Sequence, residues 1–265
     1  MPSFTFDFYS KQLAQNTSVS VILPDVETVP ENGWKVIYLL HGWSENHSAW
    51  MRYTSIERYA NKRQCAVVMP DGGLSFYNDM VNGLKYFSYI TQELPEICER
   101  YFRISRRRED NFIGGLSMGG CGSLTIGLTV PEQYAGIVCL SASNFPNSAF
   151  KEQYDSGKVW PGWLDSMKLI YGDIFPNLKG TDYDAFVKAK RVLEEGKPCP
   201  KIYHYIGLEE GDGLRWAQET QAFFEALPGN PFDYVLATRH GVHNWDSWDA
   251  VVSEGMDHVG LTEVK

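Results

Sequence analysis

The stretch Asn111 to Gly122 reads NFIGGLSMGGCG and contains the pentapeptide Gly115 to Gly119, GLSMG. This is the Gly-x-Ser-x-Gly pattern of a nucleophile elbow, a sharp turn between a strand and a helix that lifts a serine hydroxyl above the sheet. The serine of such a turn holds a strained backbone conformation, and the glycines two residues to either side let strand and helix pass close together. The pattern predicts Ser117 as a nucleophile.

The residues around the pentapeptide support this interpretation. A chain with 24 glycines among 265 residues meets the pattern by chance in roughly one case in ten, so the context has to agree. Phe112 and Ile113 suit the end of a buried strand. From Met118 to Val130 nearly every residue is apolar or small, and Pro131 follows, as expected for a buried helix and its end.

A serine nucleophile needs a base, and the base needs an acid to hold its tautomer and stabilise its cation. On a sheet of this kind the chain order is serine, acid, histidine. His41 and His47 precede the serine, which is the wrong order for the base. His204 lies within the strand pattern YHYIG, where a structural histidine is the usual outcome, and His258 lies in a polar C-terminal tail.

Two histidines remain, both in the segment RHGVHNWDSW between the last predicted strand and the last predicted helix. We favour His243 as the base, because it lies deeper in the loop and just before the apolar helix start at Trp245 and Trp248. His240 would then end the strand and help to shape the loop.

The acid is expected in the segment GLEEGDGLRW, which follows the predicted strand Lys201 to Ile206. Asp212, Glu210 and Glu209 all qualify by position. We favour Asp212, because it stands between two glycines where the backbone turns freely and it precedes the next helix. Glu210 is the reserve candidate, and a solvated loop is the alternative role for both glutamates.

Acyl chemistry also requires N–H donors directed at the developing oxyanion. The Met118 amide is one candidate, since it starts the predicted helix and the helix dipole adds to its field. The second is expected in the loop after the strand WKVIYLL, where the run His41-Gly42-Trp43 lets the backbone turn inward. The Trp43 amide is our candidate there, and His41 itself is expected to be structural.

The remaining pattern predicts one α/β domain over residues 1–265. Buried strands alternate with helices, which indicates a mostly parallel, doubly wound sheet, and the alternating segments Ser3 to Tyr9 and Ser18 to Leu23 suit an antiparallel edge. Between residues 144 and 198 the strand rhythm lapses, and we expect a cap-like excursion over the sheet. Its aromatic residues and the loop Gly72 to Asp79 should form the walls of a pocket. The aromatic residues are Trp160, Trp163, Tyr171 and Phe175.

Composition restricts the partners. A net charge of −9 disfavours nucleic acid and anionic membranes, both of which require a positive field. The first residues show neither a secretory signal nor a membrane-spanning run. The five cysteines are an odd number without a Cys-x-x-Cys pair and fit thiols in a reducing cytoplasm. We find no His-x-His or His-Glu-x-x-His cluster, so we expect neither a metal nor a cofactor.

With these residues in place, the chain resembles the tributyrin esterase-like (EstA-type) branch of the esterase D family, within the α/β-hydrolase superfamily. In that family the serine of GLSMGG is the nucleophile and the histidine before the Trp-x-x-Trp segment is the base, which match Ser117 and His243. The backbone donors match Trp43 and Met118. The family acid lies in a Gly-x-x-Asp-x-Leu stretch; the corresponding stretch here, Gly207 to Leu214, is longer, and Asp212 and Glu210 both stay open as the acid. The resemblance rests on the segments YLLHGWSENHSAW, VVMPDGGLSFYND, ELPEICERYF, FIGGLSMGG and HGVHNWDSW.

The resemblance implies hydrolysis of short-chain carboxylic esters, a small-molecule substrate and no cofactor. Relatives in the family include S-formylglutathione thioesterases, acetylxylan and feruloyl esterases, and mycolyl-type acyltransferases, and they often assemble into homo-oligomers. An acyltransferase on the same scaffold and a peptidase are the alternatives that use the same three residues. A binding protein without activity is disfavoured, because all three residues are present.

Overall fold

The computed structural model describes residues 1–25, 28–144, 149–157, 159 and 162–264. Trp160, one of the aromatic residues expected in the excursion, lies outside these ranges.

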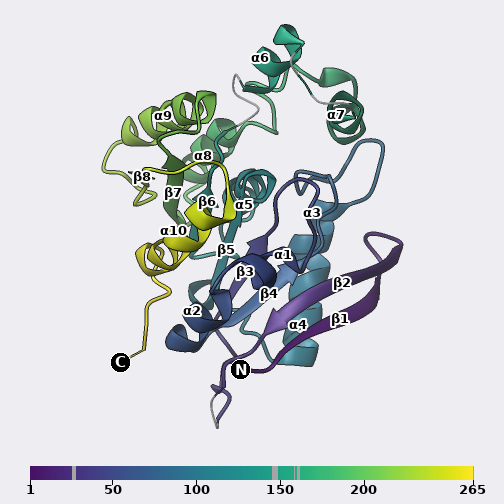
Figure 1. Cartoon of the computed structure of the whole chain (residues 1–265), viewed down its shortest axis with the longest axis vertical. Coiled ribbons are helices and arrows are strands. Elements are labelled where there is room, and N and C mark those ends of the chain that lie inside the picture. Colours follow the sequence, from purple (N-terminus) through teal and green to yellow (C-terminus); the bar gives the residue numbers. More distant parts are fainter. Residues whose placement is uncertain (26–27, 145–148, 158, 160–161, 265) are drawn as a thin grey trace.

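Within the described residues, eight strands form one sheet with the order β1-β2-β4-β3-β5-β6-β7-β8 (Figure 1). The first two strands pair antiparallel with each other, β2 pairs antiparallel with β4, and all further neighbours are parallel. This confirms the mostly parallel sheet with an antiparallel edge. The strands are β1 (Ser3–Ser10), β2 (Gln15–Ile22), β3 (Val36–Leu40), β4 (Ala66–Pro70), β5 (Asn111–Leu116), β6 (Gly136–Leu140), β7 (Lys201–Gly207) and β8 (Val235–Arg239).

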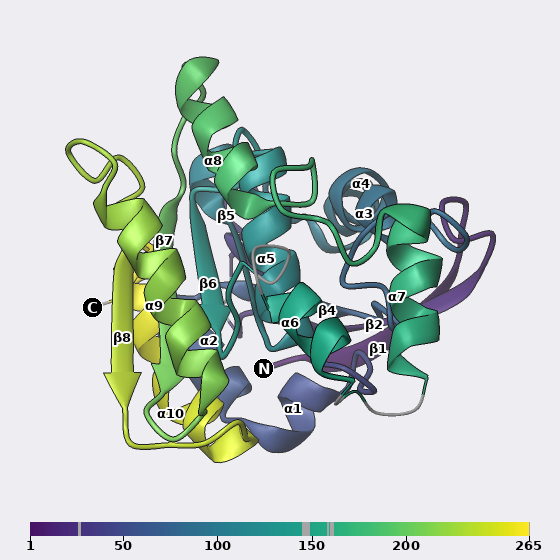
Figure 2. The same cartoon turned by 90° about the horizontal axis from the view of Figure 1, so that it is seen from above.

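Helices cover both faces of the sheet (Figures 1 and 2). The central strand β3 is buried throughout; its residues Ile37 and Leu39 pack in the core of one face, whereas Val36, Tyr38 and Leu40 pack in the other. This alternation explains why the strand reads as an unbroken apolar run. The α-helices are α1 (Ala49–Tyr53), α2 (Ile56–Arg63), α3 (Tyr86–Ser88), α4 (Leu94–Phe102), α5 (Met118–Thr129), α6 (Ala149–Ser156), α7 (Trp163–Tyr171), α8 (Ala185–Glu194), α9 (Asp212–Glu225) and α10 (Trp245–His258).

Apolar residues recur at helical spacing from Leu84 to Tyr101, yet the helix in this segment is interrupted. A π-helical turn, Tyr89–Glu93, joins α3 to α4. Pro95 lies just after this turn, in the first turn of α4. A proline ring clashes with the carbonyl four residues earlier, here that of Thr91 inside the π turn, so the interruption lies where Pro95 disturbs the helix.

The segment that follows β6 contains more helix than its sequence suggested. Two helices, α6 and α7, lie at the end of the sheet where α5 begins (Figure 1). Phe150 of α6 packs against Trp163 of α7 with ring centroids 5.7 Å apart, and against Phe175 at 6.2 Å. Aromatic packing of this kind stabilises helices that are too short to form alone. No helix among the described residues is long and apolar enough to cross a membrane.

Candidate active site

Ser117 occupies the sharp turn between β5 and α5. Its backbone angles are φ 51° and ψ −118°, a conformation that L residues rarely adopt. A Cβ on Gly115 would lie 2.4 Å from the carbonyl oxygen of Gly119, and one on Gly119 would lie 2.2 Å from that of Leu40. Only glycine fits at these two positions, so the GLSMG sequence allows the turn and the turn presents the serine.

The structure brings Ser117 and His243 together. The Ser117 hydroxyl lies 2.9 Å from Nε2 of His243, and Nδ1 of the same ring lies 2.8 Å from Oε2 of Glu210. His243 is contributed by the loop between β8 and α10, and its ring meets the Trp248 ring edge to face with centroids 5.0 Å apart. The three side chains form one hydrogen-bonded chain from three separate loops.

Glu210 is held by further donors. Its Oε1 accepts hydrogen bonds from the Gly207 amide at 2.8 Å and from the Ser141 hydroxyl at 2.6 Å. Burial raises the pKa of the Glu210 carboxyl, but its hydrogen bonds outweigh burial and hold the pKa below the usual range. The Glu210 carboxyl is therefore an anion at neutral pH. A negative charge is what the acid needs, because it must stabilise the histidine when the ring becomes positively charged.

The expectation that Asp212 faces the histidine is wrong. Asp212 is the first residue of α9, its side chain is 76% exposed, and it lies 3.7 Å from Arg215 on the helix surface. The Glu210 side chain is only 4% exposed. A longer side chain from a position two residues earlier reaches the histidine, and the glycines around Asp212 serve the start of the helix instead.

The other expected histidine, His240, pairs with the other glutamate. Nδ1 of His240 lies 2.7 Å from Glu209, whose second carboxylate oxygen accepts a hydrogen bond from the Gly241 amide at 2.6 Å. The His240 side chain is 89% exposed and makes no contact with Ser117 among the hydrogen bonds of the described residues. As expected, His240 shapes the loop.

Sequence reasoning missed Ser141. It follows β6, adopts φ 46°, and its hydroxyl donates to Glu210 while accepting a hydrogen bond from Nε1 of Trp248 at 2.7 Å. Its position directly after a parallel strand next to the elbow strand was the available signal, because the carboxyl ends of parallel strands share one edge.

Both residues expected to supply N–H donors lie beside the serine. Met118 is the first residue of α5, so its amide has no acceptor within the helix. Met118 and Trp43 line the same cavity as Ser117 and His243.

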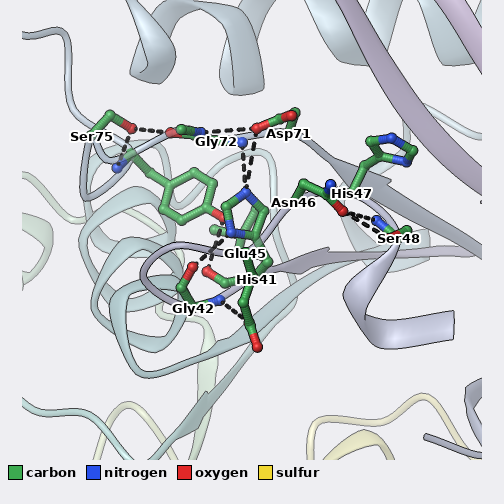
Figure 3. Close-up of polar contacts among 12 residues, drawn as sticks. His41, Gly42, Glu45, Asn46, His47, Ser48, Asp71, Gly72 and Ser75 are labelled. Carbon is green, nitrogen blue, oxygen red and sulfur yellow. Dashed lines mark hydrogen bonds and ion pairs between the residues drawn. The ribbon is translucent and has the colours of Figure 1, made fainter. Parts of the chain in front are cut away.

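The loop that carries Trp43 is fixed by His41, which is buried (Figure 3). Nδ1 of His41 lies 2.8 Å from the Gly42 carbonyl oxygen, and Nε2 lies 2.8 Å from the Gly72 amide nitrogen. The amide can only donate, so Nε2 is the acceptor and Nδ1 carries the proton that is donated to Gly42. Tyr77 adds a hydrogen bond to the His41 carbonyl at 3.1 Å. The structural role expected for His41 fits these contacts.

A cavity of about 330 Å³ opens beside Ser117. Phe76 of the loop after β4 and Phe150 and Trp163 of the excursion form part of its wall, so both expected segments contribute to the pocket. Of the aromatic residues expected in the wall, Trp163 lines the cavity, whereas Tyr171 and Phe175 are buried in the core instead. Trp43 and Trp216 add two more aromatic side chains to the wall. The volume lies at the small end of the range for ligand sites.

Among the described residues, no group of three or more His, Cys, Asp or Glu could hold a metal ion. Cys121, four residues after Ser117, is a buried free thiol whose pKa is raised by burial.

A strained serine at a strand-to-helix turn, a histidine from the last loop and a buried carboxylate on a mostly parallel sheet define the class of α/β-hydrolase-fold serine hydrolases. The "Putative esterase" family model matches residues 10–258, and the chain belongs to this esterase family.

Similar proteins agree with this assignment. The acetyl esterase of Caldicellulosiruptor saccharolyticus is 30% identical over 265 residues, with 97% of each chain covered. Substrate-bound FphF, a fluorophosphonate-binding serine hydrolase of Staphylococcus aureus, is 29% identical, with 99% of each chain covered and a TM-score of 0.83. The S-formylglutathione hydrolase FrmB of the same organism is 30% identical, with 98% of this chain and 99% of that chain covered and a TM-score of 0.80. The chain is therefore a serine esterase with the α/β-hydrolase fold.

Proposed function

We propose that the protein hydrolyses short-chain carboxylic esters through an acyl-enzyme on Ser117, with His243 as the base and Glu210 as the acid. The observation that carries this proposal is the continuous hydrogen-bonded chain from the Ser117 hydroxyl through His243 to Glu210. Glu210 takes the role first expected of Asp212.

In the first step Ser117 Oγ attacks the ester carbonyl while its proton passes to Nε2 of His243. The imidazolium then gives this proton to the departing alkoxide, which leaves as an alcohol. In the second step a water molecule attacks the acyl-enzyme, passes a proton to His243, and the acid is released as Ser117 regains its hydroxyl proton. Throughout, Glu210 keeps the Nδ1 proton in place and balances the charge of the ring.

The oxyanion of each tetrahedral intermediate would accept hydrogen bonds from the Met118 and Trp43 amides. Support comes from the free first turn of α5, whose dipole favours negative charge at this end, and from the place of Trp43 in the wall of the same cavity. Such donors contribute strongly because they are already oriented before charge develops.

The acyl group is expected to be short, as in the tributyrin esterase-like branch that the sequence resembles. The cavity of about 330 Å³, with largely aromatic walls, favours a compact acyl chain. The similar acetyl esterase supports an acetyl group as one substrate. The similar S-formylglutathione hydrolase supports a small thioester as the second candidate.

We further propose that residues 1–265 act as one domain, with the excursion at about 144–198 as its cap, in a reducing cytoplasm. All five cysteines are free thiols, which supports that compartment. The substrate is a small molecule and nucleic acid is not a partner, in keeping with a net charge of −9. A homo-oligomer is proposed only by analogy with the family.

The test is hydrolysis of p-nitrophenyl esters from acetate to octanoate by the wild type and by Ser117→Ala, with folding checked by circular dichroism. We expect activity on the shortest esters and a loss of several orders of magnitude in the variant. Activity retained by a folded Ser117→Ala protein would remove Ser117 from the mechanism.

A further inference from the structure

Glu45 lies in the loop after β3 and joins two parts of the site that are distant in sequence. Its Oε2 accepts a hydrogen bond from the Gly42 amide at 2.9 Å, and its Oε1 accepts one from Nε1 of Trp245 at 2.8 Å. The side chain is half-buried and each carboxylate oxygen meets one N–H donor. We call these two hydrogen bonds the Glu45 bridge; Figure 3 shows its Gly42 end.

The Gly42 end determines how the proposed oxyanion donor is directed. Nδ1 of His41 donates to the Gly42 carbonyl at 2.8 Å, and that carbonyl belongs to the same peptide unit as the Trp43 N–H. In a planar trans peptide the C=O and N–H groups point in opposite directions. His41 and Glu45 therefore hold Gly42 at both of its backbone groups, His41 at the carbonyl and Glu45 at the amide, and the direction of the Trp43 N–H follows from how Gly42 is held.

The Trp245 end of the bridge lies next to the catalytic base, His243. Trp245 is the first residue of α10 and follows His243 by two positions. Its ring packs edge to face against Trp50 at 5.3 Å and against Trp248 at 5.2 Å, and Trp248 in turn contacts the His243 ring. A movement of the Trp245 indole would therefore be transmitted to the base.

We propose that Glu45 is a positioning residue: by holding Gly42 and Trp245 together, it fixes the Trp43 donor and the His243 base relative to each other. This inference rests on the proposed function, because it assumes the roles given to those two residues. A carboxylate suits the task, since each oxygen accepts a hydrogen bond and hydrogen bonds to an anion are the stronger kind. A glutamine can accept one of the two bonds but turns its NH₂ group toward the other donor.

The test compares Glu45→Gln with Trp245→Phe, which removes the other partner of the bridge and keeps most of its packing. We expect kcat on p-nitrophenyl acetate to fall about tenfold in each variant while KM stays within about twofold, because placement of the reacting groups affects the transition state more than substrate binding. The inhibition constant of a boronic acid, which forms a tetrahedral adduct with the serine, should rise by a similar factor. Partial unfolding would also lower the apparent kcat at constant KM, because it removes active enzyme. It would leave the inhibition constant of the remaining enzyme unchanged, so the rise of this constant separates misplaced reacting groups from a general loss of structure.

A double-mutant cycle then isolates the bridge. In the Trp245→Phe background, Glu45→Gln should lower kcat by less than about threefold, since the bridge is already broken. The matched control is Glu254→Gln. Glu254 lies on α10, as Trp245 does, but its described ion pair is with Arg239 and not with the Gly42 loop. The substitution should leave kcat unchanged.

Two results would overturn the inference. The first is a folded Glu45→Gln enzyme with wild-type kcat. The second is a double variant whose loss of kcat equals the product of the losses in the two single variants. If Glu45→Gln does not fold, Trp245→Phe must still lower kcat without raising KM. Failure of this inference is distinct from failure of the proposed function, because Ser117→Ala tests the latter independently of Glu45.

Discussion

The Glu210 carboxylate accepts a hydrogen bond from Nδ1 of His243 at 2.8 Å, across the gap between the loops that follow β7 and β8. The same carboxylate is tied to Ser141, which follows β6. The ends of three neighbouring parallel strands thus converge on one anion. This convergence places the histidine over Ser117 at the end of a fourth strand, β5.

The first prediction separates the two acids. Glu210→Gln should lower kcat by about 10³- to 10⁴-fold, because an amide at this position favours the wrong tautomer of His243 and cannot balance its charge. Asp212→Asn should change kcat by less than about twofold, since Asp212 is exposed and pairs only with Arg215 among the described ion pairs. Steady-state kinetics on p-nitrophenyl acetate measures both. Equal losses in the two variants would contradict the assignment of Glu210.

Much of the fold follows from local sequence patterns. Buried parallel strands read as short apolar runs, and the strand predicted at Lys201 to Ile206 matches β7 within one residue. The edge strand predicted at Ser18 to Leu23 corresponds to β2, which begins three residues earlier at Gln15. Helices with a clear apolar stripe were found in the same way. The short helices α1, α6 and α7 were not predicted. Their stability comes from aromatic packing against residues distant in sequence, and not from apolar residues repeated at helical spacing.

The acid shows where sequence reasoning ends. Glu209, Glu210 and Asp212 stand within four residues of one loop, and a sequence does not say which side chain turns inward. The choice is made by the start of α9, which exposes Asp212, and by Ser141 and the Gly207 amide, which supply the donors for Glu210. Ser117 and His243, by contrast, lie in motifs whose spacing fixes their place.

The second prediction concerns the elbow itself. Gly119→Ala should destabilise the protein by about 3 kcal/mol or more, because the new Cβ would lie 2.2 Å from the Leu40 carbonyl oxygen, a backbone atom that cannot move aside. The gain of about 1 kcal/mol in helix propensity is too small to offset this clash. Urea unfolding measures the change. Thr125→Ala, on the same helix and only half-buried, is the control and should cost less than about 1 kcal/mol.

The third prediction concerns the cavity wall. Phe150→Leu removes part of a ring that lines the pocket, so longer acyl chains should fit. We expect the ratio of kcat/KM for p-nitrophenyl hexanoate to that for acetate to rise about tenfold, the usual effect of space for one further methylene group. Phe232→Leu makes the same change at a buried site that packs against Phe224, and it should leave the ratio unaltered. A fixed ratio in Phe150→Leu would place the acyl chain elsewhere.

The last prediction concerns His204, a buried residue of β7. Its ring lies 2.6 Å from the Ala142 carbonyl oxygen through Nε2 and 2.7 Å from the Tyr234 hydroxyl through Nδ1, so the neutral form donates at one nitrogen and accepts at the other. Burial lowers the pKa of His204 to about 4 despite that carbonyl and the nearby Glu210 carboxylate, both of which raise it. As the pH falls from about 6.5 to about 4, the unfolded chain therefore binds this proton before the folded one does, and stability is lost. The loss amounts to about 3 kcal/mol.

The test compares the wild type with His204→Gln, which keeps a donor to the Ala142 carbonyl. Between pH 7 and pH 4, the free energy of unfolding measured with urea should fall by about 3 kcal/mol less in the variant than in the wild type. Parallel curves for the two proteins would mean that His204 is charged in the folded state.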